Sequence, residues 1–387
     1  MTMLLRCELK KAWLKRVNRV ALVVALLAIV VFSVFAIGSF DFVDSEGTPH
    51  TGVSAARSLV EDKNQWRGEL TPEVISQAIE RYRDGDWQST YEIVFLASKM
   101  LRDEDGDSYD YEVALGADPV RIGDIYDSYQ TNLQAECEKY GKTPEQVEYL
   151  MGKYERIETP FSYEAFDTWD TMLLYATTVS IVLVVVIGFL TAGIFAEEFR
   201  YKSDAVFFSA RYGRTRATRA KACAGLIVAT AVYWIGIGLL SAVVFAAAGV
   251  SGASTPYQIV YPYSIYPVTF SQMYGMVVLG GYVGSLLSAG VSMLVASKTR
   301  SASVAVCIPF LLFCVSPFLG RALPFKTLFT LTPDQLNNVM NCSRIPYVYQ
   351  VGGTVFSQIP FIFLLYAAIA LVLVVLAKRT FGKAMLR

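Results

Sequence analysis

The side chains that most often carry out catalysis are scarce in this sequence, and none forms a recognisable catalytic pattern. His50 is the single histidine and lies outside the apolar stretches. It therefore cannot serve a zinc site within the membrane. Nor can it act as the base for Ser251, which stands in the sequence Gly249-Val250-Ser251-Gly252. No paired aspartates lie in an apolar stretch, and no Gly-x-x-x-x-Gly-Lys-Ser/Thr loop is present to hold ATP phosphates. We therefore expect a protein that is not an enzyme and holds no cofactor or metal.

An acidic run from Asp103 to Asp107, with Asp110 and Glu112 beyond it, is the closest approach to a metal-binding pattern. An EF-hand calcium loop needs glycine at its sixth position and glutamate at its twelfth. Here glycine falls at the fourth position, and Ala114 stands where the closing glutamate would be. The spacing favours a solvated loop.

The most informative polar segment is 196–221. Glu197 and Glu198 directly follow a long apolar stretch, a short apolar run covers 206–208, and four arginines and one lysine occupy 211–221. Acids, an apolar run and a basic helix in this order are typical of an amphipathic element at a membrane surface. Its charges would be available to a soluble partner.

The elements on either side of that segment are predicted from where charges are missing. Each charge-free stretch reaches the roughly 20 residues that a membrane-crossing helix needs, and the longest has room for two crossings. The stretches are 20–40, 171–196, 222–297, 301–320 and 345–377. Six spanning helices follow, at approximately 20–39, 172–195, 222–248, 272–296, 302–319 and 357–377. We expect an all-α, multi-pass protein of the cell membrane, in contact with the lipid bilayer and not with nucleic acid.

The charges around these helices predict an orientation. Residues 1–19, 197–221, 298–300 and 378–387 hold 19 of the 34 Lys and Arg residues. The segment 40–170 holds 12 Lys and Arg against 29 Asp and Glu, a net charge of −17. The positive-inside rule then places both termini in the cytosol and 40–170 outside the cytoplasm.

Three regions result: 1–39 with an interfacial helix and the first spanning helix, the acidic extracytoplasmic domain 40–170, and 171–387 with five further spanning helices. In the first region, Leu5, Leu9, Trp13 and Val17 recur every four residues and predict an amphipathic helix at the interface. A basic flank without a helix is the alternative.

The domain 40–170 is expected to be helical. Thr71 before Pro72 predicts a helix that runs to about residue 84, and Thr143 with Gln146 predicts a capping box. Apolar spacing predicts further helices over 88–102 and 119–142, with loops at 40–55 and 103–118. Its acidity either favours a cationic partner or keeps an exposed domain soluble.

Two further patterns leave alternatives open. Gly280 and Gly284 form a small-xxx-small pair, which favours packing within the bundle over a dimer seam. Four tyrosines in the charge-free loop 249–271 are typical of membrane-interface anchors, with substrate contact as the alternative. Of the six cysteines, Cys137 and Cys342 are the pair expected outside, where a disulfide can form.

The six-helix layout and the 196–221 segment resemble the permease subunits of type-2 ABC exporters. That family has an N-terminal interfacial helix and a cytosolic turn between helices two and three that docks into the ATPase. Its pattern has an acid at the end of helix two, a small-residue turn, and an arginine seven positions before a lysine. Glu197 or Glu198, the turn from Ser209 to Gly213, and Arg214 with Lys221 match it.

The resemblance implies a permease dimer, of two copies or of this chain with a related one, powered by separate ABC ATPase subunits. It implies export of an amphipathic, drug-like or peptide substrate, and the absence of charge from the spanning helices argues against ion coupling. The residues expected at the ATPase contact are Glu197, Glu198, Arg200, Lys202, Asp204, Ser209, Arg211, Gly213, Arg214 and Lys221. The alternative is a membrane-anchored receptor or envelope-interaction protein whose outer domain binds a ligand.

Overall fold

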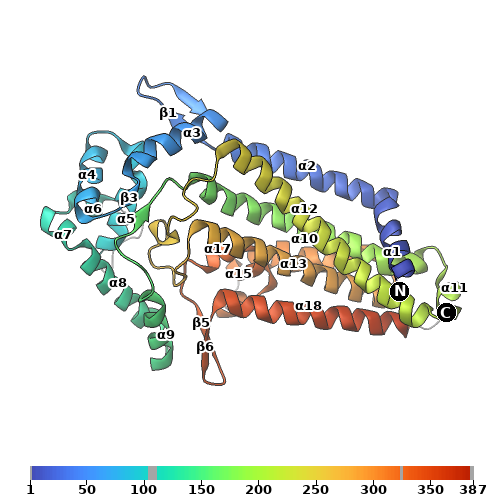
Figure 1. Cartoon of the computed structure of the whole chain (residues 1–387). Helices are drawn as coiled ribbons and strands as arrows, with labels where there is room; N and C mark the ends of the chain where they lie inside the picture. The colour runs from blue at the N-terminus through green and yellow to red at the C-terminus, as the bar shows by residue number, and fades with distance from the viewer. Residues whose placement is uncertain (1, 103–110, 323–325, 384–387) are drawn as a thin grey trace.

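The protein consists of a bundle of long helices with a lobe of short helices at one end, as a computed structural model shows (Figure 1). The structure describes residues 2–102, 111–322 and 326–383. The lobe is built from the segment between the first two long helices. Both ends of the chain lie at the opposite end of the bundle, about as far from the lobe as the molecule extends (Figure 1).

Among the described residues, six helices are long and apolar enough to cross a membrane, which confirms the predicted number of spanning helices. The fifth is formed by three consecutive pieces, because Pro309 cannot donate a backbone hydrogen bond and a π-helical turn follows it. The six are α2 (Arg16–Gly38), α10 (Asp167–Arg200), α12 (Thr218–Ala248), α13 (Phe270–Thr299), α14–η4–α15 (Ala302–Phe310, Leu311–Val315 and Ser316–Ala322), and α18 (Gln358–Gly382).

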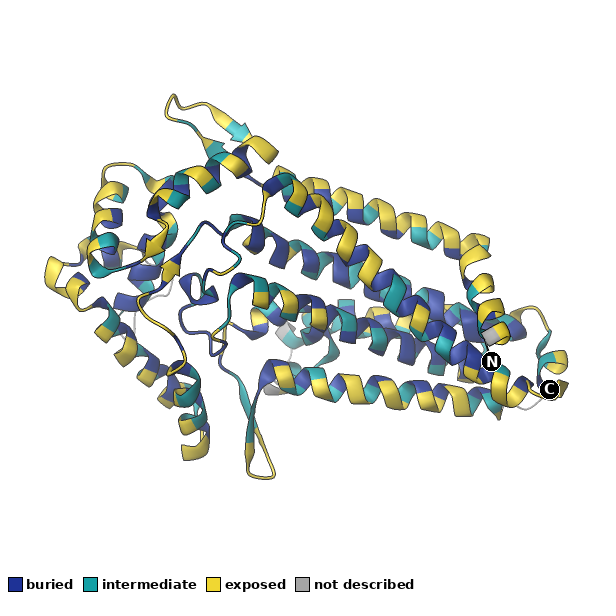
Figure 2. Ribbon diagram, in the orientation of Figure 1, coloured by how far each residue is buried: buried dark blue, intermediate teal, exposed yellow. Residues whose placement is uncertain are grey.

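The outer surface of the bundle is apolar. Helix α2 exposes Val20, Val23, Leu27, Val30 and Val34, each with about half or more of its surface accessible. Exposed residues follow the outward sides of α2 and α18, while buried residues face inward (Figure 2). Exposing an apolar surface of this extent to water is energetically unfavourable, whereas contact with lipid is favourable. The fold is therefore that of an integral membrane protein.

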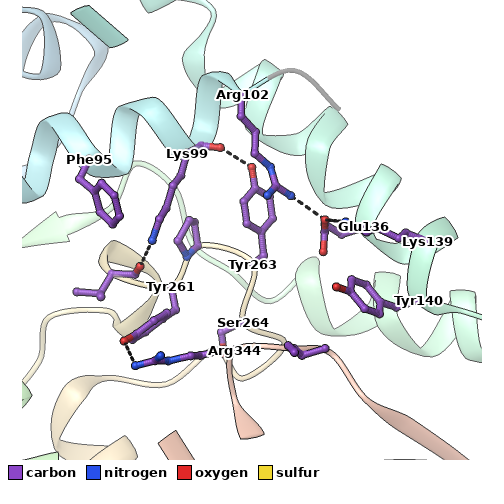
Figure 3. Close-up of a pocket in the computed structure, with 13 residues that line it drawn as sticks. Phe95, Lys99, Arg102, Glu136, Lys139, Tyr140, Tyr261, Tyr263, Ser264 and Arg344 are labelled. Carbon is purple, nitrogen blue, oxygen red and sulfur yellow. Dashed lines mark hydrogen bonds and ion pairs between the residues drawn. The ribbon is translucent and has the colours of Figure 1, made fainter. Parts of the chain in front are cut away.

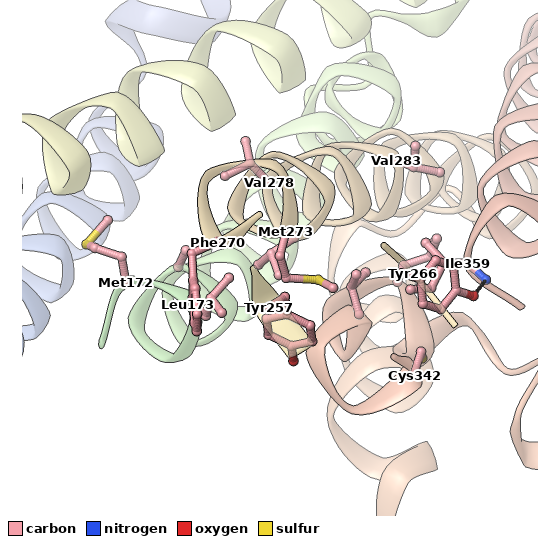
Figure 4. Packing of buried hydrophobic residues seen from close by; sticks show 14 of the residues in the cluster. Met172, Leu173, Tyr257, Tyr266, Phe270, Met273, Val278, Val283, Cys342 and Ile359 are labelled. Carbon is pink, nitrogen blue, oxygen red and sulfur yellow. Dashed lines mark hydrogen bonds between the residues drawn. The ribbon is translucent and has the colours of Figure 1, made fainter. Parts of the chain in front are cut away.

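Helix α13 lies at the centre of the bundle and contacts its neighbours through glycines. A Cβ atom added to Gly281 would lie 2.4 Å from the hydroxyl of Tyr233 on α12, and one added to Gly280 would lie 2.4 Å from the carbonyl oxygen of Leu336. The glycine stripe therefore serves packing inside this chain, as predicted. At the lobe end of α13, Phe270 and Met273 continue the core toward the tyrosine loop (Figure 4).

The lobe is mostly helical and also contains short antiparallel strand pairs. The helices are α3 (Gly52–Lys63), α4 (Pro72–Arg83), α5 (Trp87–Leu101), α6 (Glu112–Gly116), α7 (Pro119–Gly123), α8 (Ile125–Tyr140) and α9 (Pro144–Tyr154), with the 3₁₀ turn η1 (Asn64–Trp66). The strand pairs are β1 (Asp41–Val43) with β2 (Pro49–Thr51), and β3 (Gly68–Glu69) with β4 (Ser162–Tyr163). The loop expected at 40–55 is instead the β1–β2 hairpin followed by the start of α3, because backbone pairing across a turn leaves little sequence signal.

The predicted helix caps are found. The Thr71 hydroxyl accepts a hydrogen bond from the Val74 amide, and the Thr143 hydroxyl accepts one from the Gln146 amide at 3.3 Å. The side chain of Gln146 accepts from the Lys142 amide, so the second half of the expected capping box is displaced by one residue. The helix expected over 119–142 is divided into α7 and α8 at Asp124.

The loop between α12 and α13 connects the lobe to the bundle. It contains η3 (Tyr257–Ile259), and the side chains of Tyr257, Tyr263 and Tyr266 are all more than nine-tenths buried. Tyr266 accepts a hydrogen bond from the Ile359 amide at the start of α18. The expectation that these tyrosines anchor a lipid interface is therefore wrong: they are enclosed by protein, with Tyr263 against Tyr129 of the lobe and Tyr257 against Phe270 of α13.

The segment between α15 and α18 contains short helices and a hairpin. It forms α16 (Lys326–Phe329), η5 (Pro333–Asn337), α17 (Val339–Cys342) and the β5–β6 hairpin (Val348–Val351 and Thr354–Ser357). Asp334 on η5 is buried and accepts a hydrogen bond from Ser316 of α15. Polar side chains thus enter the lobe end of the bundle without lying on a spanning helix.

Candidate functional site

The segment 196–221 forms a compact turn at the end of the bundle far from the lobe (Figure 1). Helix α10 ends at Arg200, α11 covers Asp204–Ser209, and the π-helical turn η2 (Gly213–Ala217) leads into α12. Lys202, between α10 and α11, has a positive φ of 53° that reverses the chain direction. The predicted amphipathic element is thus a short helix held between two long ones.

Glycine is required where α11 meets η2. A Cβ atom added to Gly213 would lie 1.8 Å from the backbone carbonyl oxygen of Phe207, so no other residue fits without moving the turn. The carbonyl oxygen of Gly213 accepts a hydrogen bond from the hydroxyl of Thr218 on α12 at 2.9 Å. This close approach fixes α11 against the first turn of α12.

The apolar residues of α11 face inward against α18. The ring centroids of Phe207 and Phe208 lie 5.7 and 5.1 Å from that of Phe381, and Phe199 of α10 lies 5.6 Å from the same ring. Aromatic rings at such separations attract one another in addition to burying apolar area. The contact ties the turn to α10 and α18, so a displacement of α11 would be felt by both helices.

Arginines and a few apolar side chains form the outward surface of the turn. Arg211 and Arg216 are exposed and lie over the ring of Tyr212, at 5.3 and 4.4 Å from its centroid. Arg214 lies over Phe208 and donates to the carbonyl oxygen of Gly382. Val206 leaves 74% of its surface accessible. We call 201–216 the docking turn, after the partner contact that the sequence analysis predicts for it.

Beneath the docking turn lies a buried cluster of charges. The Lys221 side chain is fully buried, and its Nζ lies 2.9 Å from Glu8 Oε2 and 2.9 Å from Glu198 Oε2. It also donates to the carbonyl oxygen of Ile194 at 3.0 Å. At the exposed edge of the cluster, Lys11 lies 3.1 Å from Glu8 and 3.6 Å from Glu198, with 47% of its side-chain surface accessible. Two lysines and two glutamates therefore compensate one another where three helices meet.

The cluster joins α1 (Thr2–Leu14) to the ends of α10 and α12. Glu8 and Ala12 of α1 are buried, whereas Trp13 and Val17 are exposed. The predicted helix is present, but its inward side includes Glu8, which pairs with Lys221, and Ala12 beside the half-buried Leu5 and Leu9. Burial opposes protonation of Lys11, but Glu8, Glu198 and Glu197 outweigh it and raise the pKa of Lys11 above its ordinary value.

The ten residues predicted at the ATPase contact fall into three groups in the structure. Exposed on the surface are Arg200, Lys202, Ser209, Arg211 and Arg214. Half-buried are Asp204 and Glu197, the latter 3.9 Å from Lys15. Enclosed by the chain are Glu198, Gly213 and Lys221. The enclosed residues position the docking turn and do not present side chains to a partner.

Two members of the charge cluster, Glu8 and Lys11, were missed by sequence reasoning. One signal was available, since Glu8 is the single acid among six basic residues in 1–19. A lone acid in a basic flank does not predict a buried ion pair unless its partner is known. That partner, Lys221, lies 213 residues further along the chain.

The predicted disulfide is not formed, and both of its cysteines are buried free thiols. Burial raises the pKa of Cys137 to about 11 and that of Cys342 to about 12, which disfavours the reactive thiolate. The described residues contain no group of three or more His, Cys, Asp or Glu side chains able to hold a metal ion. The acidic run from Asp103 to Asp107 lies outside the described residues.

Comparison of the chain with protein-family models, with curated proteins and with solved structures finds no match.

Proposed function

We propose that this chain is the membrane-spanning permease subunit of an ATP-binding-cassette transporter, with separate ATPase subunits docking on residues 201–216. The observation that carries the proposal is the docking turn itself. An exposed, arginine-rich surface rests on a buried charge cluster and an aromatic cluster, at the bundle end away from the lobe. A simple connection between two spanning helices would need neither the charge cluster nor the aromatic cluster beneath it.

The charge cluster and the aromatic cluster give a route by which motion of the docking turn reaches the spanning helices. A displacement of α11 reaches α18 through Phe381, and it reaches Lys221 through Phe207, whose ring centroid lies 5.5 Å from Lys221 Nζ. Lys221 and its two glutamates join α1, α10 and α12. Packed helices move as rigid bodies between discrete arrangements more readily than they deform. ATP-driven motion of a docked ATPase would then shift four helices together and alternate the accessibility of the translocation path.

The path is proposed to form between two permease copies, or between this chain and a related one. The least enclosed spanning segments are α14–α15 and α2. In their most apolar 18 residues, 17% and 22% of the residues are buried, compared with 72% in α13. These outer helices have the surface to contact lipid or a second permease. The central stretches of the spanning helices carry no charged residue, which favours an apolar or amphipathic substrate over an ion.

The orientation follows from the positive-inside rule. The docking turn and both termini would lie in the cytosol, where ATP is available, and the lobe outside the cell membrane. Placing the arginine-rich turn and the acidic lobe on opposite sides also agrees with their separation along the bundle (Figure 1).

The proposal is tested by photo-crosslinking from the docking turn. A photoreactive amino acid replaces Val206, and a matched variant carries it at Val120 on the lobe, since the two positions expose 74% and 72% of their surfaces. The partner is the product of any neighbouring gene that encodes a P-loop ATPase. We expect a crosslinked ATPase from position 206 and none from position 120. Absence of a crosslink at 206, with ATPase present, would favour the receptor function instead.

A further inference from the structure

A cavity of about 700 Å³ opens where the lobe meets the bundle (Figure 3). Helices α5 and α8 of the lobe form one side, and segments 260–264 and 344–345 form the other. Cavities that bind small molecules commonly measure about 300–1,000 Å³. A ligand held here would contact the lobe and two segments tied to the spanning helices.

Cations dominate the lining. Four basic side chains face one acid, Glu136, which leaves a net charge of 4 − 1 = +3. The basic side chains are Lys99, Arg102, Lys139 and Arg344. This is opposite in sign to the charge of −17 on segment 40–170. Fields from distant exposed carboxylates are screened over about 8–10 Å in physiological salt, so the lining governs what the cavity binds.

The single acid does not neutralise all four cations. Arg102 donates to Glu136 at 2.7 Å, and Lys139 lies 3.4 Å from the same oxygen. Lys99 instead donates to the backbone carbonyl oxygen of Val260 at 2.8 Å, and Arg344 donates to the hydroxyl of Tyr261. Neither Lys99 nor Arg344 forms an ion pair with any carboxylate of the described residues.

Aromatic faces hold the cations in place. Lys99 Nζ lies 4.0 Å from the centroid of Phe95, and the Arg102 guanidinium lies 3.9 Å from that of Tyr263. The Arg344 guanidinium lies 4.6 Å from the ring centroid of Tyr261. A cation–π contact orients a cation without cancelling its charge. An ammonium has three N–H donors and a guanidinium five, so donors remain for an incoming acceptor.

The charged state of Lys99 is disfavoured by its surroundings in the cavity. Burial lowers its pKa to about 8, with repulsion from Arg344 and Arg102 adding to the effect. Besides these three cations, the titratable groups that line the cavity are Glu136, Lys139 and Tyr140 of α8 and the hydroxyls of Tyr261 and Tyr263. A bound anion would supply the missing counter-charge.

Hydrogen bonds from the lobe fix the opposite wall. The hydroxyl of Tyr129 donates to the carbonyl oxygen of Pro262 at 2.6 Å, and that of Tyr154 donates to the carbonyl oxygen of Tyr263 at 2.8 Å. The hydroxyl of Tyr263 donates in turn to the backbone carbonyl oxygen of Lys99. A cavity with its wall already ordered loses little conformational entropy when it binds a ligand.

We propose that this cavity binds an amphipathic anion whose phosphate group lies between Lys99, Arg102 and Arg344. Its apolar part packs on Phe95 and Tyr140. A phospholipid headgroup and a free phosphorylated small molecule share this chemistry. The inference does not depend on ATP-driven transport and applies equally to a receptor.

Isothermal titration of the full chain in detergent tests the site with three probes. They are dioctanoyl phosphatidic acid, inorganic phosphate and the zwitterionic dioctanoyl phosphatidylcholine. We expect phosphatidic acid to bind more tightly than phosphatidylcholine, and its affinity to fall as salt is raised. Comparable binding of inorganic phosphate would identify a free phosphate compound as the source. Equal affinity for both lipids, or no binding of any probe, would overturn the proposal.

Variants with opposite expected effects exclude misfolding as an explanation. Lys99→Gln should weaken phosphatidic acid binding about tenfold or more, the loss typical of one charge-assisted hydrogen bond, and Lys99→Arg should retain it. Glu136→Gln removes the competing carboxylate and should strengthen binding. Arg57→Gln alters an exposed lobe cation outside the cavity and should leave affinity unchanged. Equal affinity of the Lys99→Gln, Glu136→Gln and wild-type proteins would refute the assignment.

Discussion

Lys221, at the start of α12, lies 2.9 Å from Glu8 on the N-terminal helix, and no part of the Lys221 side chain is accessible to solvent. Desolvating an ammonium is costly unless opposite charges and hydrogen bonds compensate it. Glu8, Glu198 and the Ile194 carbonyl oxygen supply that compensation. The pair therefore makes the position of α1 depend on the two helices that carry the docking turn.

The first prediction concerns the stability of this cluster. Lys221→Met should lower the free energy of unfolding by roughly 3–5 kcal/mol, because it leaves two buried carboxylates without their main partner. Thermal melting in detergent measures the effect, and Lys10→Met, at an exposed position of the same α1 helix, is the control. A Lys221→Met variant as stable as wild type would show that the cluster contributes nothing.

The second prediction concerns the turn at Gly213. Gly213→Ala should distort the docking turn, because its Cβ would clash with the Phe207 carbonyl oxygen, and should lower both the melting temperature and ATPase stimulation. Gly238 on α12 is the matched control, with no atom within 4 Å of an added Cβ. Gly238→Ala should be neutral, or more stable by up to about 1 kcal/mol, because alanine favours the helix. Equal behaviour of the two variants would contradict the close approach.

The third prediction concerns charge on the docking turn. Charge reversal at Arg214 or Glu197 should uncouple ATP hydrolysis from transport without preventing membrane insertion, with Arg211→Glu acting in the same direction. The assay compares ATPase activity, transport and ATPase co-purification. Lys10→Glu reverses an exposed charge outside the turn and should have no effect. Normal coupling in all the turn variants would remove the basis for the docking assignment.

The fourth prediction concerns orientation. In a background with all six cysteines replaced by serine, Val206→Cys and Val120→Cys should be labelled by a membrane-impermeant reagent from opposite sides. The lobe position should react in intact cells, and the docking-turn position only after the membrane is opened. Labelling of both positions from outside would disprove the arrangement predicted by the charge bias.

The fifth prediction concerns pH and Lys99. Burial lowers the pKa of Lys99 to about 8 in the folded state, whereas the ordinary pKa of about 10.5 applies to the unfolded chain. Below pH 8 both states bind the proton, and between pH 8 and 10.5 the unfolded state binds more, so this group's contribution to stability rises with pH. Relative to Lys99→Met, wild type should gain roughly 2–3 kcal/mol between pH 7.5 and 10. Phosphatidic acid affinity should fall over the same range, and a flat difference in stability would contradict the lowered pKa.

Much of the fold could be predicted from the sequence because it depends on local composition. Charge-free stretches determine the spanning helices, since hydrocarbon excludes charge and requires internally bonded backbone. Thr71 and Thr143 cap helices through contacts only three residues long. The glycine stripe on α13 also indicated close packing within the bundle. None of these features depends on a distant partner.

Tertiary structure decided what the polar residues do. Glu198 and Lys221 belong to the same motif as Arg211, yet burial makes the first two positioning residues and leaves the third on the surface. The cationic cavity brings together Lys99 and Arg344, 245 positions apart, within a chain of zero net charge. A charge count along the sequence sums charged residues that the fold places far from one another. The electrostatics of a site depend on which groups burial brings together, and only the packed chain determines that.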